Sequence, residues 1–229
     1  SIFQKHPEFD RIGKLKSSLQ FWNSHTAFKN LTLDFGAIRA TTRNCFIKSK
    51  YGEKVSLNNL TDSTLIPIGT IGPDIFQNKV LIIDYPNERF TICDTVPHDY
   101  KTGMTDIELD EAGRVLLTTS VNGKDYKIMF DNGASLFPLI VPVRNINDFS
   151  KAPGIDTIVT SSFGTVHRVI GRPIKDSIQI GGRFYSNFLV YADYRNEDQN
   201  EENIVATGNA LFWHKSVIID FKNKKFGVK

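Results

Sequence analysis

The sequence predicts an all-β protein with two similar lobes and short helical turns, and two observations carry this prediction. The chain of 229 residues contains 17 phenylalanines and many β-branched residues, a composition that favours strands. The chain also repeats itself, because residues 72–92 match residues 208–228 without a gap, at an offset of 208 − 72 = 136. Two copies indicate two lobes rather than a solenoid, which needs more repeats.

The two copies predict the same series of elements. Gly, Phe, Lys, Ile, Ile, Asp, Asn and Phe recur at equivalent places, and most other positions are alike in type. After Gly72 and after Gly208 we expect a short helical turn, a strand, a tight turn containing asparagine, and a second strand. A weaker match relates residues 33–36 to residues 178–181, at an offset of 145. Small closed or crossed barrels would protect the many strand edges.

The boundary between the lobes is predicted in the polar stretch 97–103, which separates two apolar patterns. The first lobe then spans residues 1–97 and the second lobe spans residues 104–229. The chain does not begin with Met and carries no signal-like apolar segment, so we interpret Ser1 as a processed or truncated start.

Composition excludes several classes of partner and cofactor. The net charge is only +3, with no basic stripe, and no apolar run reaches membrane-spanning length, so we expect neither nucleic acid nor a membrane span. The five histidines are scattered without ligand spacing, so we expect no metal and no cofactor. Cys45 and Cys93 are the only cysteines; they either pair or are buried thiols, and we favour buried thiols.

The main candidate for a functional motif is FDNGAS at residues 130–135. The apolar run 128–130 leads to Asp131, and a second apolar run, residues 136–141, follows the motif. A charge between two strand-like runs is costly to bury unless it is hydrogen-bonded or used. We expect Gly133 to let the backbone turn tightly around the acid. Two interpretations stay open at this point: a plain hairpin with a polar tip, and a catalytic carboxylate.

These motifs together resemble those of pepsin-like and retropepsin-like aspartic peptidases, especially bacterial two-lobed forms. In that family each lobe carries an apolar-apolar-Asp-Thr/Ser-Gly-Ala/Ser turn and a later apolar-Gly segment that crosses beneath it. Residues 130–135 look like the acidic turn of the second lobe, and residues 70–72 and 206–208 look like the crossing segments of the two lobes. The resemblance covers about residues 30–92 and 115–229, and it implies two acid-protease barrels.

The resemblance also implies roles for single residues. Asp131 is the expected catalytic carboxylate. The residues expected to support it are Asn132, Gly133, Ala134 and Ser135. Asn132 departs from the family pattern, in which a Thr or Ser hydroxyl at this position ties the two acidic turns together.

A mobile hairpin usually closes the substrate cleft in such proteins. The Ser-rich segment 161–167 is the candidate for this hairpin in the second lobe, with Phe163 and Gly164 as the expected substrate-binding residues. A plain surface hairpin is the alternative interpretation of this segment.

Peptide hydrolysis by this route needs two carboxylates, one to activate water and one to protonate the amide. The offsets of 136 and 145 place the counterpart of Asp131 about five to fourteen residues before Ser1 (131 − 136 = −5; 131 − 145 = −14). Asp10 and Asp34 are the nearest candidates inside the chain, and neither is assigned as the partner because neither is flanked by apolar residues and a D-x-G turn. Although Asp34 and Gly36 have the spacing of such a turn, we interpret Asp34 as part of the strand that matches residues 178–181.

The leading hypothesis is therefore an aspartic endopeptidase that acts on a peptide or protein substrate, with its second aspartate outside this chain. The alternative is a catalytically inactive protein that binds peptides in the same cleft. Completion of the dyad by dimerisation is disfavoured, because the repeat already supplies two lobes. A separate N-terminal fragment is a further possible partner, and the resemblance favours an exported protein, periplasmic or extracellular.

Overall fold

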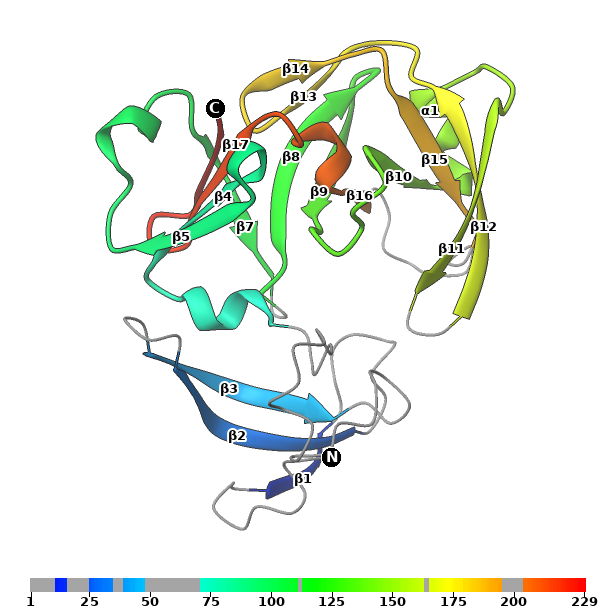
Figure 1. Ribbon diagram of the computed structural model, residues 1–229. Coiled ribbons are helices and arrows are strands. Elements are labelled where there is room, and N and C mark those ends of the chain that lie inside the picture. Colours follow the sequence, from blue (N-terminus) through cyan, green and yellow to red (C-terminus); the bar gives the residue numbers. More distant parts are fainter. Residues whose placement is uncertain are drawn as a thin grey trace. The chain divides into compact units, whose positions relative to one another are not determined.

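The protein is described by a computed structural model that covers residues 11–15, 25–34, 39–47, 71–110, 113–162, 165–194 and 204–229 (Figure 1). Strands dominate these residues, so the predicted all-β class is confirmed. The helices are single turns: η4 (Pro73–Phe76), η5 (Tyr85–Asn87), η6 (His98–Tyr100), η7 (Val143–Asn145), α1 (Ile146–Phe149) and η8 (Asn209–Leu211).

The chain divides into two compact units, one of residues 1–75 with 111–113 and one of residues 76–110 with 114–229. In the first unit the described strands form an antiparallel three-stranded sheet in the order β1-β2-β3. These strands are β1 (Arg11–Leu15), β2 (His25–Asp34) and β3 (Arg39–Ile47).

The second unit contains an eight-stranded sheet in the order β11-β12-β15-β10-β16-β9-β8-β7 (Figure 1). Its strands are β7 (Glu108–Leu109), β8 (Val115–Val121), β9 (Lys124–Phe130), β10 (Leu139–Pro142), β11 (Asp156–Ser162), β12 (Thr165–Pro173), β15 (Leu189–Asp193) and β16 (Ile204–Thr207). A two-stranded ribbon of β13 (Ile178–Ile180) and β14 (Arg183–Tyr185) accompanies it. In this order β16 lies between β10 and β9, although both strands precede it in the sequence by more than sixty residues. This arrangement determines the course of the segment that connects β9 to β10.

A second, five-stranded sheet has the order β5-β4-β17-β18-β6. Its strands are β4 (Val80–Asp84), β5 (Arg89–Cys93), β6 (Thr105–Asp106), β17 (Ser216–Asp220) and β18 (Lys225–Val228). In the antiparallel pair of β4 and β17, Ile82 lies opposite Ile218, its equivalent in the sequence repeat. The register is therefore symmetric about this residue pair. Each copy of the repeat supplies one strand of the central pair, β4 or β17, and the strand beside it, β5 or β18.

Each copy of the repeat forms the elements that the sequence predicts. A 3₁₀ helix follows Gly72 and another follows Gly208, and a strand, a tight turn and a second strand come after each. The tight turns share a left-handed residue at equivalent positions, Glu88 with φ 50° and Lys224 with φ 53°. The local pattern is thus the same in both copies.

The predicted lobe boundary at residues 97–103 does not coincide with the limits of the compact units. The predicted first lobe includes strands β4 and β5, yet they belong to the second unit because β4 pairs with β17 along its whole length. Backbone pairing between the two copies joins segments that are far apart in the sequence. The assignment of residues 1–97 and 104–229 to two lobes stays a prediction.

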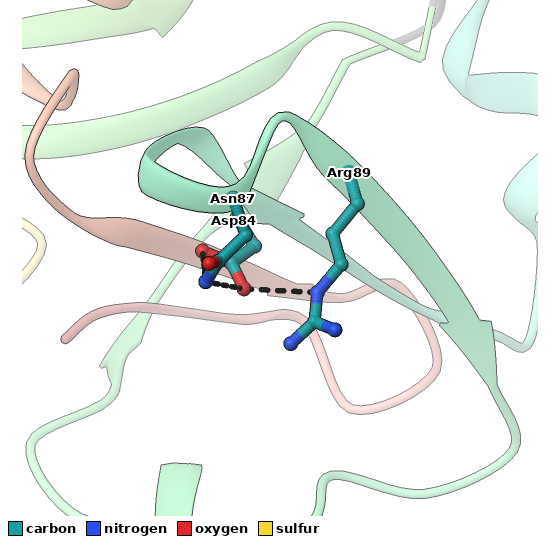
Figure 2. A network of polar contacts seen from close by, with 3 residues as sticks. All are labelled: Asp84, Asn87 and Arg89. Carbon is teal, nitrogen blue, oxygen red and sulfur yellow. Dashed lines mark hydrogen bonds and ion pairs between the residues drawn. The ribbon is translucent and has the colours of Figure 1, made fainter.

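A buried aspartate organises each tight turn of the repeat. Asn87 Nδ2 donates hydrogen bonds to both carboxylate oxygens of Asp84, at 3.0 and 2.9 Å, and Arg89 Nε donates to Oδ2 at 3.1 Å (Figure 2). In the second copy Asn223 Nδ2 donates to Asp220 Oδ2 at 2.7 Å. The hydrogen bonds from Asn87, aided by Arg89 and opposed by burial, hold the pKa of Asp84 below its usual value.

Replacing Asp84 by asparagine is expected to lower stability at neutral pH. The folded-state pKa of Asp84 is depressed, so its contribution is present above the unfolded-state value of about 4 and is lost as pH falls through the folded value. Urea unfolding of wild type and Asp84→Asn between pH 7 and pH 2 measures this, and the two curves should converge at low pH. Asp106→Asn is the control, because Asp106 is exposed and pairs only at the surface with Lys225. A difference between wild type and Asp84→Asn that does not change with pH would contradict the prediction.

Candidate active site

The candidate site is the acid turn, residues 131–138, which connects β9 to β10. The plain-hairpin interpretation of this segment is wrong, because β9 and β10 do not pair with each other. Strand β16 lies between them, parallel to β9 and antiparallel to β10 (Figure 1). The acid turn therefore arches over the end of β16, where the predicted crossing segment 206–208 lies.

Backbone hydrogen bonds hold the acid turn to the crossing segment. The N–H of Asp131 donates to the carbonyl oxygen of Thr207 at 2.9 Å, and the N–H of Gly208 donates to that of Phe137 at 3.1 Å. Thr207 is fully buried, and its Oγ1 donates to the carbonyl oxygen of Pro138 at 2.8 Å. Three hydrogen bonds thus fix the turn at both of its ends.

Gly208 is the residue on which the crossing depends. A Cβ atom at this position would lie 1.8 Å from the carbonyl oxygen of Ala134 and 2.7 Å from that of Phe137. Both atoms belong to the backbone of the acid turn, so neither can rotate away. Only glycine lets the crossing segment approach the turn so closely.

Asp131 is half-buried at the start of the turn. Its Oδ1 accepts a hydrogen bond from the N–H of Gly133 at 2.9 Å, and its carbonyl oxygen accepts one from Ala134 at 3.1 Å. Gly133 does not adopt a positive φ. A Cβ at this position would lie 3.0 Å from the same carboxylate oxygen, so the Asp131 side chain would have to move to make room for it.

The supporting residues predicted from the sequence lie together in the acid turn. Asn132, Gly133 and Ser135 are exposed, while Ala134 is half-buried and packs against a cluster that contains the buried Phe137. This cluster also includes Val169 of β12 and Tyr191 of β15. The acid turn is therefore packed onto the hairpin of β11 and β12.

The predicted cleft-closing segment 161–167 forms the tip of that hairpin. Its backbone pairs Ser161 with Val166 and Ser162 with Thr165. Phe163 and Gly164, the expected substrate-binding residues, lie outside the described residues. The hairpin itself is present, and its role stays a prediction.

Strand β9 is anchored at the end opposite the acid turn. Tyr126 is buried against Phe149 of α1, with ring centroids 4.8 Å apart, and its hydroxyl donates a short hydrogen bond to Asp148. Burial and the Asp148 carboxylate raise the pKa of Tyr126, so the hydroxyl keeps its proton. At the other end of β9, Phe130 packs against Phe212 and Phe226. Asp131 thus follows a strand that is held in the core at both ends.

Two residues close to the acid turn were not singled out from the sequence. Asn209 follows the crossing glycine and donates through Nδ2 to the carbonyl oxygen of Asn132 at 2.9 Å. Tyr85 donates through its hydroxyl to Asn209 Oδ1 at 2.7 Å. Asn209 could have been identified from the sequence, because it directly follows the predicted crossing glycine. Tyr85 could not, because it is 124 residues away from Asn209 and no local pattern indicates the contact.

The described residues hold no group of three or more His, Cys, Asp or Glu side chains arranged to bind a metal ion. Cys93 is a half-buried free thiol, and burial raises its pKa. The side chain of Cys45 lies outside the described residues. Asp34, which was not assigned as the second carboxylate, is exposed at the end of β2 and pairs with Arg39 at 3.2 Å. Among the helices of the described ranges, none has the length and apolar character needed to cross a bilayer.

The chain was compared with protein families, with curated proteins and with solved structures. No protein-family model matches the chain, and no curated protein matches its sequence. The structure is similar to that of a retropepsin-like aspartic protease from Rickettsia conorii, with 17% sequence identity and a TM-score of 0.38. The match covers 55% of this chain and 91% of the other. A similarity at this level does not show the function, which is therefore inferred from the geometry of the acid turn.

Proposed function

We propose that this protein is an aspartic-type endopeptidase in which Asp131 is one of two catalytic carboxylates. The observation that carries the proposal is the crossing of β16 beneath the acid turn, which presents a half-buried carboxylate bonded to the N–H of Gly133. A carboxylate held by a backbone amide keeps a defined orientation toward a reacting water.

The proposed chemistry needs a second carboxylate at close range. Two such groups do not both ionise cheaply, so one keeps a proton and acts as the acid while the other acts as the base. We infer from the offset of the sequence repeat that this second carboxylate is the counterpart of Asp131 in a segment upstream of Ser1. A substrate peptide would bind in extended form, with backbone hydrogen bonds like those of an added strand. The hairpin of β11 and β12 would then close over it.

The experiment uses the protein extended upstream through the predicted first acid turn, assayed with a fluorogenic peptide library at acid pH. Asp131→Asn is expected to lower peptidase activity by at least about a hundredfold, because a positioned acid or base contributes about 10²–10⁴-fold. Asp125→Asn is the matched control, since Asp125 is exposed on the same strand and far along it from the turn. Equal activity of wild type and Asp131→Asn would remove Asp131 from the mechanism.

One observation favours a second function, the binding of peptides without hydrolysis. Asn132 occupies the place where the family has a hydroxyl residue that ties the two acid turns together, and it is exposed. Asparagine is longer and planar, and it offers a different hydrogen-bonding geometry. If the extended protein binds peptides in calorimetry but hydrolyses none of them, the binding function replaces the enzymatic one.

A further inference from the structure

Asn209 links the acid turn to a side chain of the other repeat copy. Its Oδ1 accepts from the Tyr85 hydroxyl at 2.7 Å, and its Nδ2 donates to the carbonyl oxygen of Asn132 at 2.9 Å. A carboxamide oxygen only accepts and the nitrogen only donates, so these two partners together define the orientation of the Asn209 side chain.

The link continues to the carboxylate of Asp131 through one peptide group. The carbonyl oxygen of Asn132 and the N–H of Gly133 belong to the same planar peptide, and this N–H donates to Asp131 Oδ1 at 2.9 Å. A hydrogen bond accepted by the carbonyl polarises the peptide and strengthens its N–H as a donor. Tyr85, Asn209 and this peptide therefore form a continuous chain of hydrogen bonds that ends on the carboxylate.

Tyr85 is suited to donate at the far end of the chain. It is half-buried against the main core, and burial raises its pKa to about 12. The phenol therefore stays protonated at acid and neutral pH, and its O–H remains a donor throughout the range in which carboxylates titrate.

The repeat shows that this link is not a by-product of the shared local structure. At the offset of 136, the equivalent of Tyr85 is Phe221 and the equivalent of Asn209 is Pro73. Phe221 has no hydroxyl and stacks on Phe76, with ring centroids 5.8 Å apart. Neither equivalent can make the corresponding side-chain hydrogen bond, so the chain of hydrogen bonds serves only the turn that carries Asp131.

We propose that Tyr85 and Asn209 are positioning residues that set the orientation and hydrogen bonding of the Asp131 carboxylate through the Asn132–Gly133 peptide. Their effect on catalysis depends on the proposed peptidase function, whereas their effect on the acid turn does not. Without the Asn209 carboxamide, the Asn132 carbonyl oxygen loses its side-chain donor. Without the Tyr85 hydroxyl, the Asn209 carboxamide loses the hydrogen bond that orients it. The Gly133 N–H then binds the carboxylate less strongly.

The test is nuclear magnetic resonance of the 229-residue chain, with the Gly133 amide as the probe. In Tyr85→Phe and in Asn209→Asp, the Gly133 amide proton is expected to shift upfield and to exchange with solvent about two- to tenfold faster, the range that one net hydrogen bond supplies. Tyr185→Phe is the matched control, because Tyr185 is another tyrosine packed in the core, with a pKa raised to about 12, and its hydroxyl has no hydrogen-bond partner within the described ranges. An unchanged Gly133 amide in both Tyr85→Phe and Asn209→Asp overturns the proposal.

A second readout separates this proposal from the proposed function. If the upstream-extended protein is an active peptidase, Tyr85→Phe should lower kcat about two- to tenfold with KM unchanged, and the acid limb of its pH profile should move. An extended protein without activity contradicts the peptidase function, while the Gly133 amide still decides whether Tyr85 and Asn209 position the turn.

Discussion

Replacing Gly208 by alanine is expected to destabilise the protein by about 3 kcal/mol or more, at the upper end of overpacking costs. The new Cβ would lie 1.8 Å from the carbonyl oxygen of Ala134, so the crossing segment and the acid turn must separate. Their separation would break the hydrogen bonds from Gly208 to Phe137 and from Asp131 to Thr207. The variant should therefore lose both stability and the arrangement of the site.

Urea unfolding followed by tryptophan fluorescence measures this effect. Gly72→Ala is the matched control, because Gly72 occupies the equivalent place in the first copy of the repeat. There, among the described residues, a Cβ would meet only the Asp74 carboxylate, with Oδ1 at 2.9 Å, and this side chain can rotate away. We expect a loss below about 1 kcal/mol for the control. Equal unfolding midpoints for Gly208→Ala and wild type would show that the crossing is not as close as described.

Truncating Phe226 to alanine is expected to cost about 3–5 kcal/mol, the usual range for a buried phenylalanine. Phe226 is 0% exposed and contacts Phe130 and Phe212, with ring centroids 5.5 and 6.3 Å away. Its ring also lies against Gly181, where a Cβ would come within 2.6 Å of it. The residue thus fills a tightly packed space next to the strand that leads to Asp131, and alanine would leave a cavity there.

The repeat supplies a matched control for Phe226. Phe90 stands at the equivalent position of the first copy, yet it is 65% exposed. Phe90→Ala should therefore change the free energy of unfolding by less than about 1 kcal/mol, as measured in the same urea experiment. Comparable losses for the two variants would mean that the surroundings of the two rings are more alike than the structure shows.

Both predictions concern the packing that holds the acid turn in place, and not the reactivity of the Asp131 carboxylate. Gly208 determines how closely the crossing segment approaches the turn, and Phe226 packs against the residue that precedes Asp131. Asp131→Asn, in contrast, keeps the volume of the side chain and tests the carboxylate itself. Activity lost in Asp131→Asn with stability retained would separate chemistry from support.

Local patterns in the sequence predicted the elements of each repeat copy. The apolar runs predicted strands, and the asparagine-containing turns were found where expected, with Asp84 and Asp220 as their acceptors. These features depend on residues within a few positions of one another, so a short stretch of sequence carries the necessary information. The same local information predicted a turn at Asp131, where the N–H of Gly133 donates to the carboxylate.

The sequence by itself determined an all-β chain, a repeated strand–turn–strand unit and the position of a lone aspartate between two apolar runs. Only the tertiary structure decided that β16 separates β9 from β10, that β4 pairs with β17, and that Tyr85 reaches Asn209. These contacts join residues far apart in the chain, and their energies arise from backbone pairing and side-chain packing between distant segments. Periodicity and turn residues determine whether a segment forms a strand or a turn. They do not determine which distant segment a strand pairs with, because this pairing depends on the packing of the whole unit.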